Sequence, residues 1–160
     1  MRYAFSKYEG LGNDFLVVEQ ARFPEVTAEL AIKLCDRHFG VGGDGVLITG
    51  LRDGRPFMSV VNADGSKPEM CGNGLRCVAL YLADRGLVRD VAFEVATEAG
   101  PHFVRVARDE QGANVEVRMR HASIDAADVL REERGRFLDA PFQLESQRVH
   151  LSAVSMGNPH

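Results

Sequence analysis

The sequence has no basic excess and no long apolar run, and each shortage excludes a class of protein. Lys and Arg number 19 against 23 Asp and Glu, which gives a net charge of −4. Proteins that bind nucleic-acid backbones normally carry a basic excess. The longest apolar run, residues 77–83, is far shorter than the roughly 18–20 residues that cross a bilayer. We therefore expect neither a nucleic acid nor a membrane among the partners.

Cysteine is also scarce, and its pattern excludes two kinds of structural site. The 3 cysteines are an odd number, which favours free thiols over a disulfide framework. They lack Cys-x-x-Cys spacing and the histidines are scattered along the chain, so we expect no metal ion. The first residues lack the apolar core of a signal peptide, which predicts a cytoplasmic protein.

What the sequence contains is typical of a globular chain. Hydrophobic residues make up 45% and charged residues 26% of the sequence, which is an ordinary globular composition. Its length of 160 residues is enough for one full domain or for one domain and part of another. From residue 121 to 140 the composition becomes charged and the hydrophobic period is unclear. We therefore predict a domain boundary near residue 120, with a first domain over 1–120 and the start of a second over 121–160.

The hydrophobic pattern predicts the fold class. Thr27 can cap a helix that extends to about His38, with an apolar stripe along one side. A second helix, residues 72–85, is apolar on nearly all sides, which is typical of a buried helix. Short strand-like segments lie on both sides of it, at residues 3–8, 14–19, 46–49, 57–61, 91–97, 103–108 and 115–120. These elements predict an α+β domain in which a mixed, curved sheet wraps around a central buried helix.

The segment that leads into the buried helix is the strongest candidate for chemistry. A strand ends at Asn62, a turn follows, and Cys71 stands where the helix begins. The first backbone N–H groups of a helix, here those of Gly72, Asn73 and Gly74, have no partner within it and can bind an anion. The same positive end favours a thiolate. A thiolate beside a bound carboxylate suits proton transfer at the adjacent carbon.

Other interpretations of these residues stay open. Spacing alone is equally compatible with Cys71 as a small buried residue and residues 72–74 as a simple turn. A thiolate at a helix start also suits a thiol-based redox protein, although no resolving cysteine is nearby. A non-catalytic amino-acid-binding module is a third possibility. Residues 40–45 fit Gly-x-Gly-x-x-Gly, but they follow a helix and precede a strand, so a tight connecting turn is favoured over a dinucleotide site.

Four separated motifs, at residues 10–15, 57–66, 70–76 and 154–160, make the chain resemble the diaminopimelate epimerase family. That family interconverts LL- and meso-2,6-diaminopimelate without pyridoxal phosphate, on the route to lysine and cell-wall precursors. The resemblance therefore implies an amino-acid epimerase, an isomerase, that needs no cofactor. Proline racemases usually have Cys-Gly-His-Gly at the first cysteine, so Asn73 favours the diaminopimelate branch over a related racemase with another substrate.

The resemblance also implies roles for individual residues. Cys71 matches one of two acid/base thiols, and Gly72 and Asn73 match residues whose backbone binds the substrate carboxylate. His160 matches a position that tunes the ionisation of the catalytic thiols. Where some members have a substrate-contacting glutamine, this chain has Gly45, so we do not expect that contact. The positions that match substrate-contacting asparagines are Asn13, Asn62 and Asn158.

The reaction requires a second thiol, because inversion needs a base on one face of the carbon and an acid on the other. Cys35 lies on the apolar stripe of its helix, and Cys77 is about 240° around the helix from Cys71. The resemblance implies two similar halves with the active site between them and the second cysteine in the later half. We therefore expect an incomplete chain that does not epimerise alone. For the full-length protein we expect a small amino-acid substrate and a homodimer.

Overall fold

The computed structural model describes residues 3–110, 112–125, 135–136 and 138–156. The chain divides into two compact units, Met1–Arg118 and Met119–His160, and each is described by itself.

The first unit contains one mixed sheet whose seven strands follow one another in sequence order. Neighbouring strands are antiparallel except for the pairs β2–β3 and β4–β5, which are parallel. Parallel neighbours need a crossover connection, and these two crossovers contain α1 (Ala28–Cys35) and α2 (Gly72–Asp84). The strands are β1 (Ser6–Gly10), β2 (Asn13–Glu19), β3 (Gly45–Arg52), β4 (Arg55–Asn62), β5 (Ala92–Thr97), β6 (Gly100–Asp109) and β7 (Gly112–Val117).

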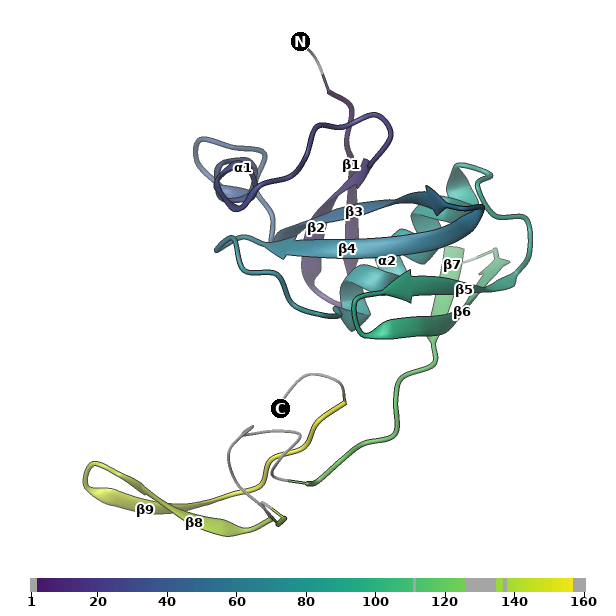
Figure 1. Ribbon diagram of the computed structural model, residues 1–160. Coiled ribbons are helices and arrows are strands. Elements are labelled where there is room, and N and C mark those ends of the chain that lie inside the picture. The colour runs from purple at the N-terminus through teal and green to yellow at the C-terminus, as the bar shows by residue number, and fades with distance from the viewer. Residues whose placement is uncertain (1–2, 111, 126–134, 137, 157–160) are drawn as a thin grey trace. The chain divides into compact units, whose positions relative to one another are not determined.

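Helix α2 is the centre of this unit. It contacts strands from both edges of the sheet, β1 and β7, as well as strands between them, so the sheet curls around it (Figure 1). Leu75, Val78 and Leu82 of α2 are completely buried, and burial of each such side chain contributes about 1.5–3 kcal/mol. The expected α+β fold with a curved sheet around a buried helix is confirmed.

Strand β2 is buried on both faces because a different helix covers each one. Phe15 and Val17 pack in the core cluster with α2. Leu16 and Val18, whose side chains point to the opposite face, pack in a second cluster that contains Ala31 and Cys35 of α1. The start of β2 is therefore anchored by two cores.

Helix α1 begins where the sequence predicts and ends earlier. Thr27 is its N-cap, and the Thr27 side chain accepts a hydrogen bond from the first turn. The helix ends at Cys35 instead of near His38. The Asp36 carboxylate accepts hydrogen bonds from the backbone nitrogens of His38 and Phe39, at 2.7 and 2.8 Å, and these local bonds replace further helical turns.

The second unit contains a hairpin of β8 (Ala140–Leu144) and β9 (Gln147–Leu151). Ser123 and Ser155 pair through two backbone hydrogen bonds of 2.8 Å each. Over the described residues of both units, no helix combines the length and apolar character that a membrane span requires.

Candidate functional site

Two predicted site positions, Asn13 and Asn62, lie at one edge of the sheet on either side of Gly45, although all three are far apart in the sequence. Asn13 begins β2, Gly45 begins β3 and Asn62 ends β4. The strand register pairs Gly45 with Phe15 on one side and with Asn62 on the other. The sheet therefore gathers these positions at the ends of three adjacent strands.

Cys71 is the N-cap of α2. Its backbone is extended, with φ −136° and ψ 111°, and its Sγ accepts a hydrogen bond from the Gly74 nitrogen at 3.3 Å. This is the position at which a serine or aspartate usually caps a helix. The side chain is half-buried and stands at the end of the helix where the first backbone N–H groups have no partner within the helix.

The first two backbone N–H groups of α2 are available to a ligand. Within the described part of the chain, neither the Gly72 nor the Asn73 backbone nitrogen has a hydrogen-bond partner, whereas the Leu75 nitrogen donates to the Cys71 carbonyl oxygen at 2.8 Å. Such first-turn donors bind carboxylates and phosphates. The thiol and two anion-binding donors thus belong to three consecutive residues.

The side chains of Asn13 and Asn73 are in contact. Asn73 Nδ2 donates to Asn13 Oδ1 at 2.7 Å, and Arg76 Nη1 donates to Asn73 Oδ1 at 3.1 Å. The approach depends on Gly10 at the end of β1, where an added Cβ would lie 3.1 Å from the Asn73 backbone oxygen. A side chain there would push α2 away from the strands.

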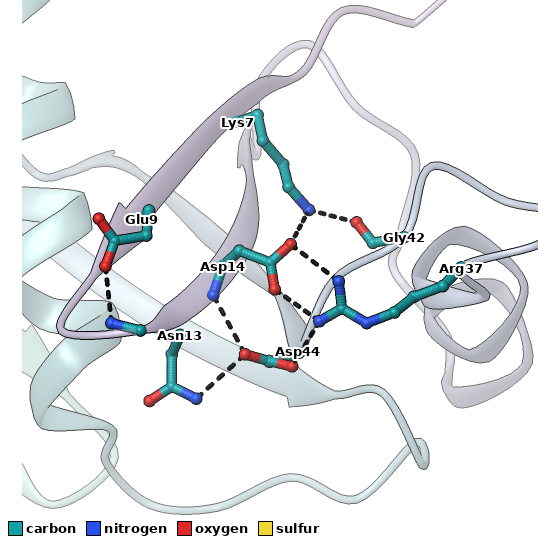
Figure 2. A network of polar contacts seen from close by, with 8 residues as sticks. Lys7, Glu9, Asn13, Asp14, Arg37, Gly42 and Asp44 are labelled. Atoms are coloured by element: carbon teal, nitrogen blue, oxygen red, sulfur yellow. Dashed lines mark hydrogen bonds and ion pairs between the residues drawn. The ribbon is translucent and has the colours of Figure 1, made fainter.

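Asn13 is hydrogen-bonded to a network of charged residues around Asp14 (Figure 2). Arg37 forms ion pairs with Asp14 at 2.6 Å and with Asp44 at 2.8 Å, and Lys7 forms a pair with Asp14 at 2.7 Å. Hydrogen bonds from Arg37 and Lys7 hold the pKa of Asp14 well below its usual range. The Asn13 amide, which donates to Asp44 Oδ2 at 3.0 Å, is the largest cause that lowers the pKa of Asp44.

Asp44 and Arg37 have no predicted role, because residues 40–45 indicate only a connecting turn in the sequence. No local signal marks Asp44, because its contact with Asn13 depends on β3 lying parallel beside β2, where the starts of the two strands lie side by side.

Asn62 makes its contacts within its own turn. Its Nδ2 donates to Ser66 Oγ at 2.9 Å, and its backbone nitrogen donates to the Ser66 carbonyl oxygen at 2.9 Å. It therefore shares the sheet edge with Asn13 but is not hydrogen-bonded to it in the described structure. Asn158 and His160 lie outside the described residues.

The other two cysteines are unsuited to exchange protons with a ligand. Cys35 is 4% exposed and Cys77 is 2% exposed. Burial raises the pKa of the Cys35 thiol and raises that of Cys77 to about 11. Both thiols are therefore protonated and enclosed at neutral pH.

The candidate site consists of Cys71, the first two backbone N–H groups of α2 and the Asn13–Asn73 pair, and it does not coincide with a cavity of about 790 Å³ in the first unit. This cavity is lined by Phe23, Val26 and Ile48 among others, and Cys71 is not part of its wall. Polar side chains such as Gln20, Arg52 and Lys67 also line it, but none of the predicted site residues that the structure describes does, so we assign the candidate site to Cys71 and the groups around it.

Solved structures share the fold. A hydroxyproline epimerase from Agrobacterium vitis matches with a TM-score of 0.63 at 14% identity, over 94% of this chain and 48% of that one. A probable proline racemase from Agrobacterium radiobacter matches with a TM-score of 0.62 at 14% identity, over 94% and 48%. At this identity the likeness concerns the fold alone.

Sequence comparison identifies the family. The chain is 39% identical to diaminopimelate epimerase 1 of Nostoc sp., over 100% of this chain and 60% of that protein. It is 41% identical to a diaminopimelate epimerase of Pelotomaculum thermopropionicum, over 98% and 58%. The chain thus spans about three fifths of the length of these relatives. The family model for diaminopimelate epimerase matches residues 5–124, and the chain belongs to the diaminopimelate epimerase family.

Proposed function

We propose that the complete protein containing this chain is a diaminopimelate epimerase, with Cys71 as one of its two acid/base thiols. The observation that supports this most directly is the position of Cys71 as N-cap of α2, where its sulfur lies beside the backbone donors of the next two residues. The relatives that cover the whole chain are named for this activity. The proposed substrate is LL-2,6-diaminopimelate, and the proposed product is the meso form.

The proposed reaction moves one proton off and one proton onto the same carbon. The substrate carboxylate binds to the N–H groups of Gly72 and Asn73, and the Cys71 thiolate removes the Cα proton to become a thiol. The electron pair left on Cα spreads into the carboxylate, where the two N–H groups and the helix dipole stabilise the added charge. A second thiol then donates its proton to the opposite face. No electrons are lost, and the stereocentre is inverted.

The second thiol has to come from a cysteine other than Cys35 or Cys77. Both are enclosed in the core clusters, so neither sulfur can donate a proton to the opposite face of a carbon bound beside Cys71. We therefore propose that residues 1–160 by themselves do not epimerise the substrate, and that another part of the protein supplies the acid for the second face.

The asparagines are proposed to orient the rest of the zwitterion. An amide side chain offers both donors and an acceptor, so it can bind an ammonium and a carboxylate group. Asn73 lies in the first turn of α2 and is hydrogen-bonded to Asn13, and Asn62 is at the same sheet edge as Asn13. Asn158 is assigned a similar role on the family resemblance, with His160 tuning the thiols.

Deuterium exchange tests the proposal. In D₂O, the complete enzyme should incorporate deuterium at Cα of LL-diaminopimelate, and Cys71→Ser should abolish incorporation into this LL substrate. Cys35→Ala is the matched control, since it removes a thiol from the opposite side of the sheet and should retain exchange. Exchange that survives Cys71→Ser would contradict the proposal. Consumption of peroxide or disulfide without exchange would favour a redox thiol protein, and ligand binding without exchange would favour a binding module.

A further inference from the structure

Asp44 connects the candidate site to the charged network, because it contacts both Asn13 and Arg37. Its Oδ2 accepts hydrogen bonds from Asn13 Nδ2 at 3.0 Å and from the Asp14 backbone nitrogen at 3.1 Å. Its Oδ1 accepts from Arg37 Nη2 at 2.8 Å. Every one of these contacts uses the carboxylate as an acceptor.

The acceptor-only character of Asp44 determines how Asn13 is oriented. An ionised carboxylate has no hydrogen to donate, so Asn13 must turn its NH₂ group toward Asp44. The Asn13 oxygen then faces Asn73 and accepts from its Nδ2 at 2.7 Å. Arg76, which can only donate, fixes the other end through its bond to Asn73 Oδ1 at 3.1 Å. Asp44 at one end of this series of hydrogen bonds only accepts and Arg76 at the other end only donates, so together they fix the orientation of both amides.

Asp44 is itself held in place from several directions. Its backbone nitrogen donates to the Asp14 carbonyl oxygen at 2.7 Å, and its carbonyl oxygen accepts from the Ala63 nitrogen at 3.0 Å. Arg37 bridges the Asp44 and Asp14 carboxylates (Figure 2). Without this cation the Asp14 and Asp44 carboxylates would repel each other, and this repulsion would drive the Asp44 side chain toward solvent.

We propose that Asp44, held by Arg37, is a positioning residue that fixes the orientation of the Asn13 and Asn73 amides for substrate binding. In this orientation each amide uses one N–H in the network, and its second N–H has no hydrogen-bond partner within the described part of the chain. A flipped amide would present an oxygen to the substrate carboxylate in place of a donor. The inference rests on the proposed function, because it takes Asn13 and Asn73 as substrate ligands.

The test replaces Asp44 with asparagine in the complete enzyme. Asp44→Asn keeps the shape but can donate as well as accept, so it no longer determines which way Asn13 turns. We expect kcat/KM to fall about 10- to 100-fold, the range for losing a hydrogen bond to a charged group. Because the amides bind the substrate before and during proton transfer, the loss should come mainly from a raised KM.

Asp84→Asn is the matched control for the loss of a carboxylate paired with arginine. Asp84, at the other end of α2, accepts hydrogen bonds from Tyr8 and Arg108. We expect its replacement to lower stability and to leave KM within about twofold of the wild type, because it does not contact the amides.

A double-mutant cycle separates positioning from a general structural effect. If Asp44 acts through Asn13, then Asp44→Asn should reduce kcat/KM less than threefold in an Asn13→Ala background, whereas a structural effect would persist there in full. Arg37→Gln, at a side chain that is 56% exposed, should give a smaller, 3- to 10-fold loss with the same dependence on Asn13. It decides the question if Asp44→Asn does not fold.

The possible failures are distinguishable. Equal losses in both backgrounds, or wild-type kinetics of Asp44→Asn while Asn13→Ala is impaired, would overturn the positioning role and leave the proposed function intact. Wild-type kinetics of Asn13→Ala would overturn both the positioning role and the assignment of Asn13 as a substrate ligand. Loss of Cα deuterium exchange on Cys71→Ser tests the proposed function independently of either result.

Discussion

Asn73 donates a side-chain hydrogen bond to Asn13 over 2.7 Å, although 60 positions separate the two residues. The bond connects the first turn of α2 to the first residue of β2, so the thiol-bearing helix end and the sheet edge form one surface. Neither residue would have this partner without the curled sheet that brings β2 against α2.

Replacing Asn73 with aspartate should separate stability from substrate binding. A carboxylate in the first turn of a helix interacts favourably with the helix dipole and can still accept from Arg76. It cannot donate to Asn13, and it repels a substrate carboxylate. We expect Asn73→Asp to change the free energy of unfolding by less than about 1 kcal/mol, because the helix dipole and Arg76 offset the lost bond to Asn13, and to weaken binding of diaminopimelate by more than about tenfold, which is 1.4 kcal/mol.

Calorimetric titration and denaturant unfolding measure the two quantities. Gln20→Glu, an equal change of charge at the opposite end of β2, serves as the control and should bind normally. Undiminished binding by Asn73→Asp would show that the carboxylate is not bound at this helix end.

Two substitutions of Cys71 should differ in stability while both are inactive. The thiol caps α2 by accepting from the Gly74 nitrogen. Serine can accept the same bond, whereas alanine cannot, and loss of an N-cap costs about 1 kcal/mol. We therefore expect Cys71→Ser to unfold at a urea concentration close to that of the wild type and Cys71→Ala at a lower one. Identical midpoints for the two variants would mean that the cap contributes nothing.

Alkylation should distinguish the three thiols in the native protein. Cys71 is half-buried, while Cys35 and Cys77 are buried and have raised pKa values. With a pKa of about 11, Cys77 is a thiolate in only about one molecule in a thousand at pH 8. Iodoacetamide followed by mass spectrometry should therefore label Cys71 first, and label Cys35 and Cys77 only after denaturation. Labelling of Cys77 in the native protein at the rate of Cys71 would contradict this prediction.

Much of the first unit could be predicted from the sequence because its hydrophobic pattern is local. The nearly uniform apolar surface of α2 indicated burial, and the structure places strands around it. Similarly, Thr27 marked the start of α1. The end of α1 was not predictable from periodicity, since it depends on the Asp36 side chain bonding to two backbone nitrogens.

The site was predictable only in part, because some of its contacts depend on strand order. Cys71, Gly72 and Asn73 are consecutive, so their place at a helix start follows from one local pattern. The partnership of Asp44 with Asn13 requires knowing that β2 and β3 are parallel neighbours. In the sequence Arg37 resembles any charged residue near a helix end. Only the folded segment between α1 and β3 brings it to Asp14.

The Arg37 network should make the stability of the protein depend on pH in the acid range. The pKa values of Asp14 and Asp44 are lowered in the folded protein, Asp14 mainly by its hydrogen bond from Arg37 and Asp44 mainly by that from Asn13. These carboxylates bind protons more weakly in the folded than in the unfolded state. Their stabilising effect is therefore present above the unfolded Asp pKa of about 3.9 and is lost as pH falls from there toward the lower folded values.

Arg37→Gln should flatten this dependence. The variant removes the cation that pairs with both carboxylates, so the two pKa values should rise toward their ordinary range. We expect the free energy of unfolding of the wild type to fall more steeply than that of Arg37→Gln between about pH 4 and pH 2, and the two curves to run parallel above pH 5. Arg105→Gln, which loses only a surface pair of 3.8 Å with Glu116, should retain the wild-type slope. If urea unfolding gave the same slope for Arg37→Gln and the wild type, the network would not couple the folding of this unit to protonation.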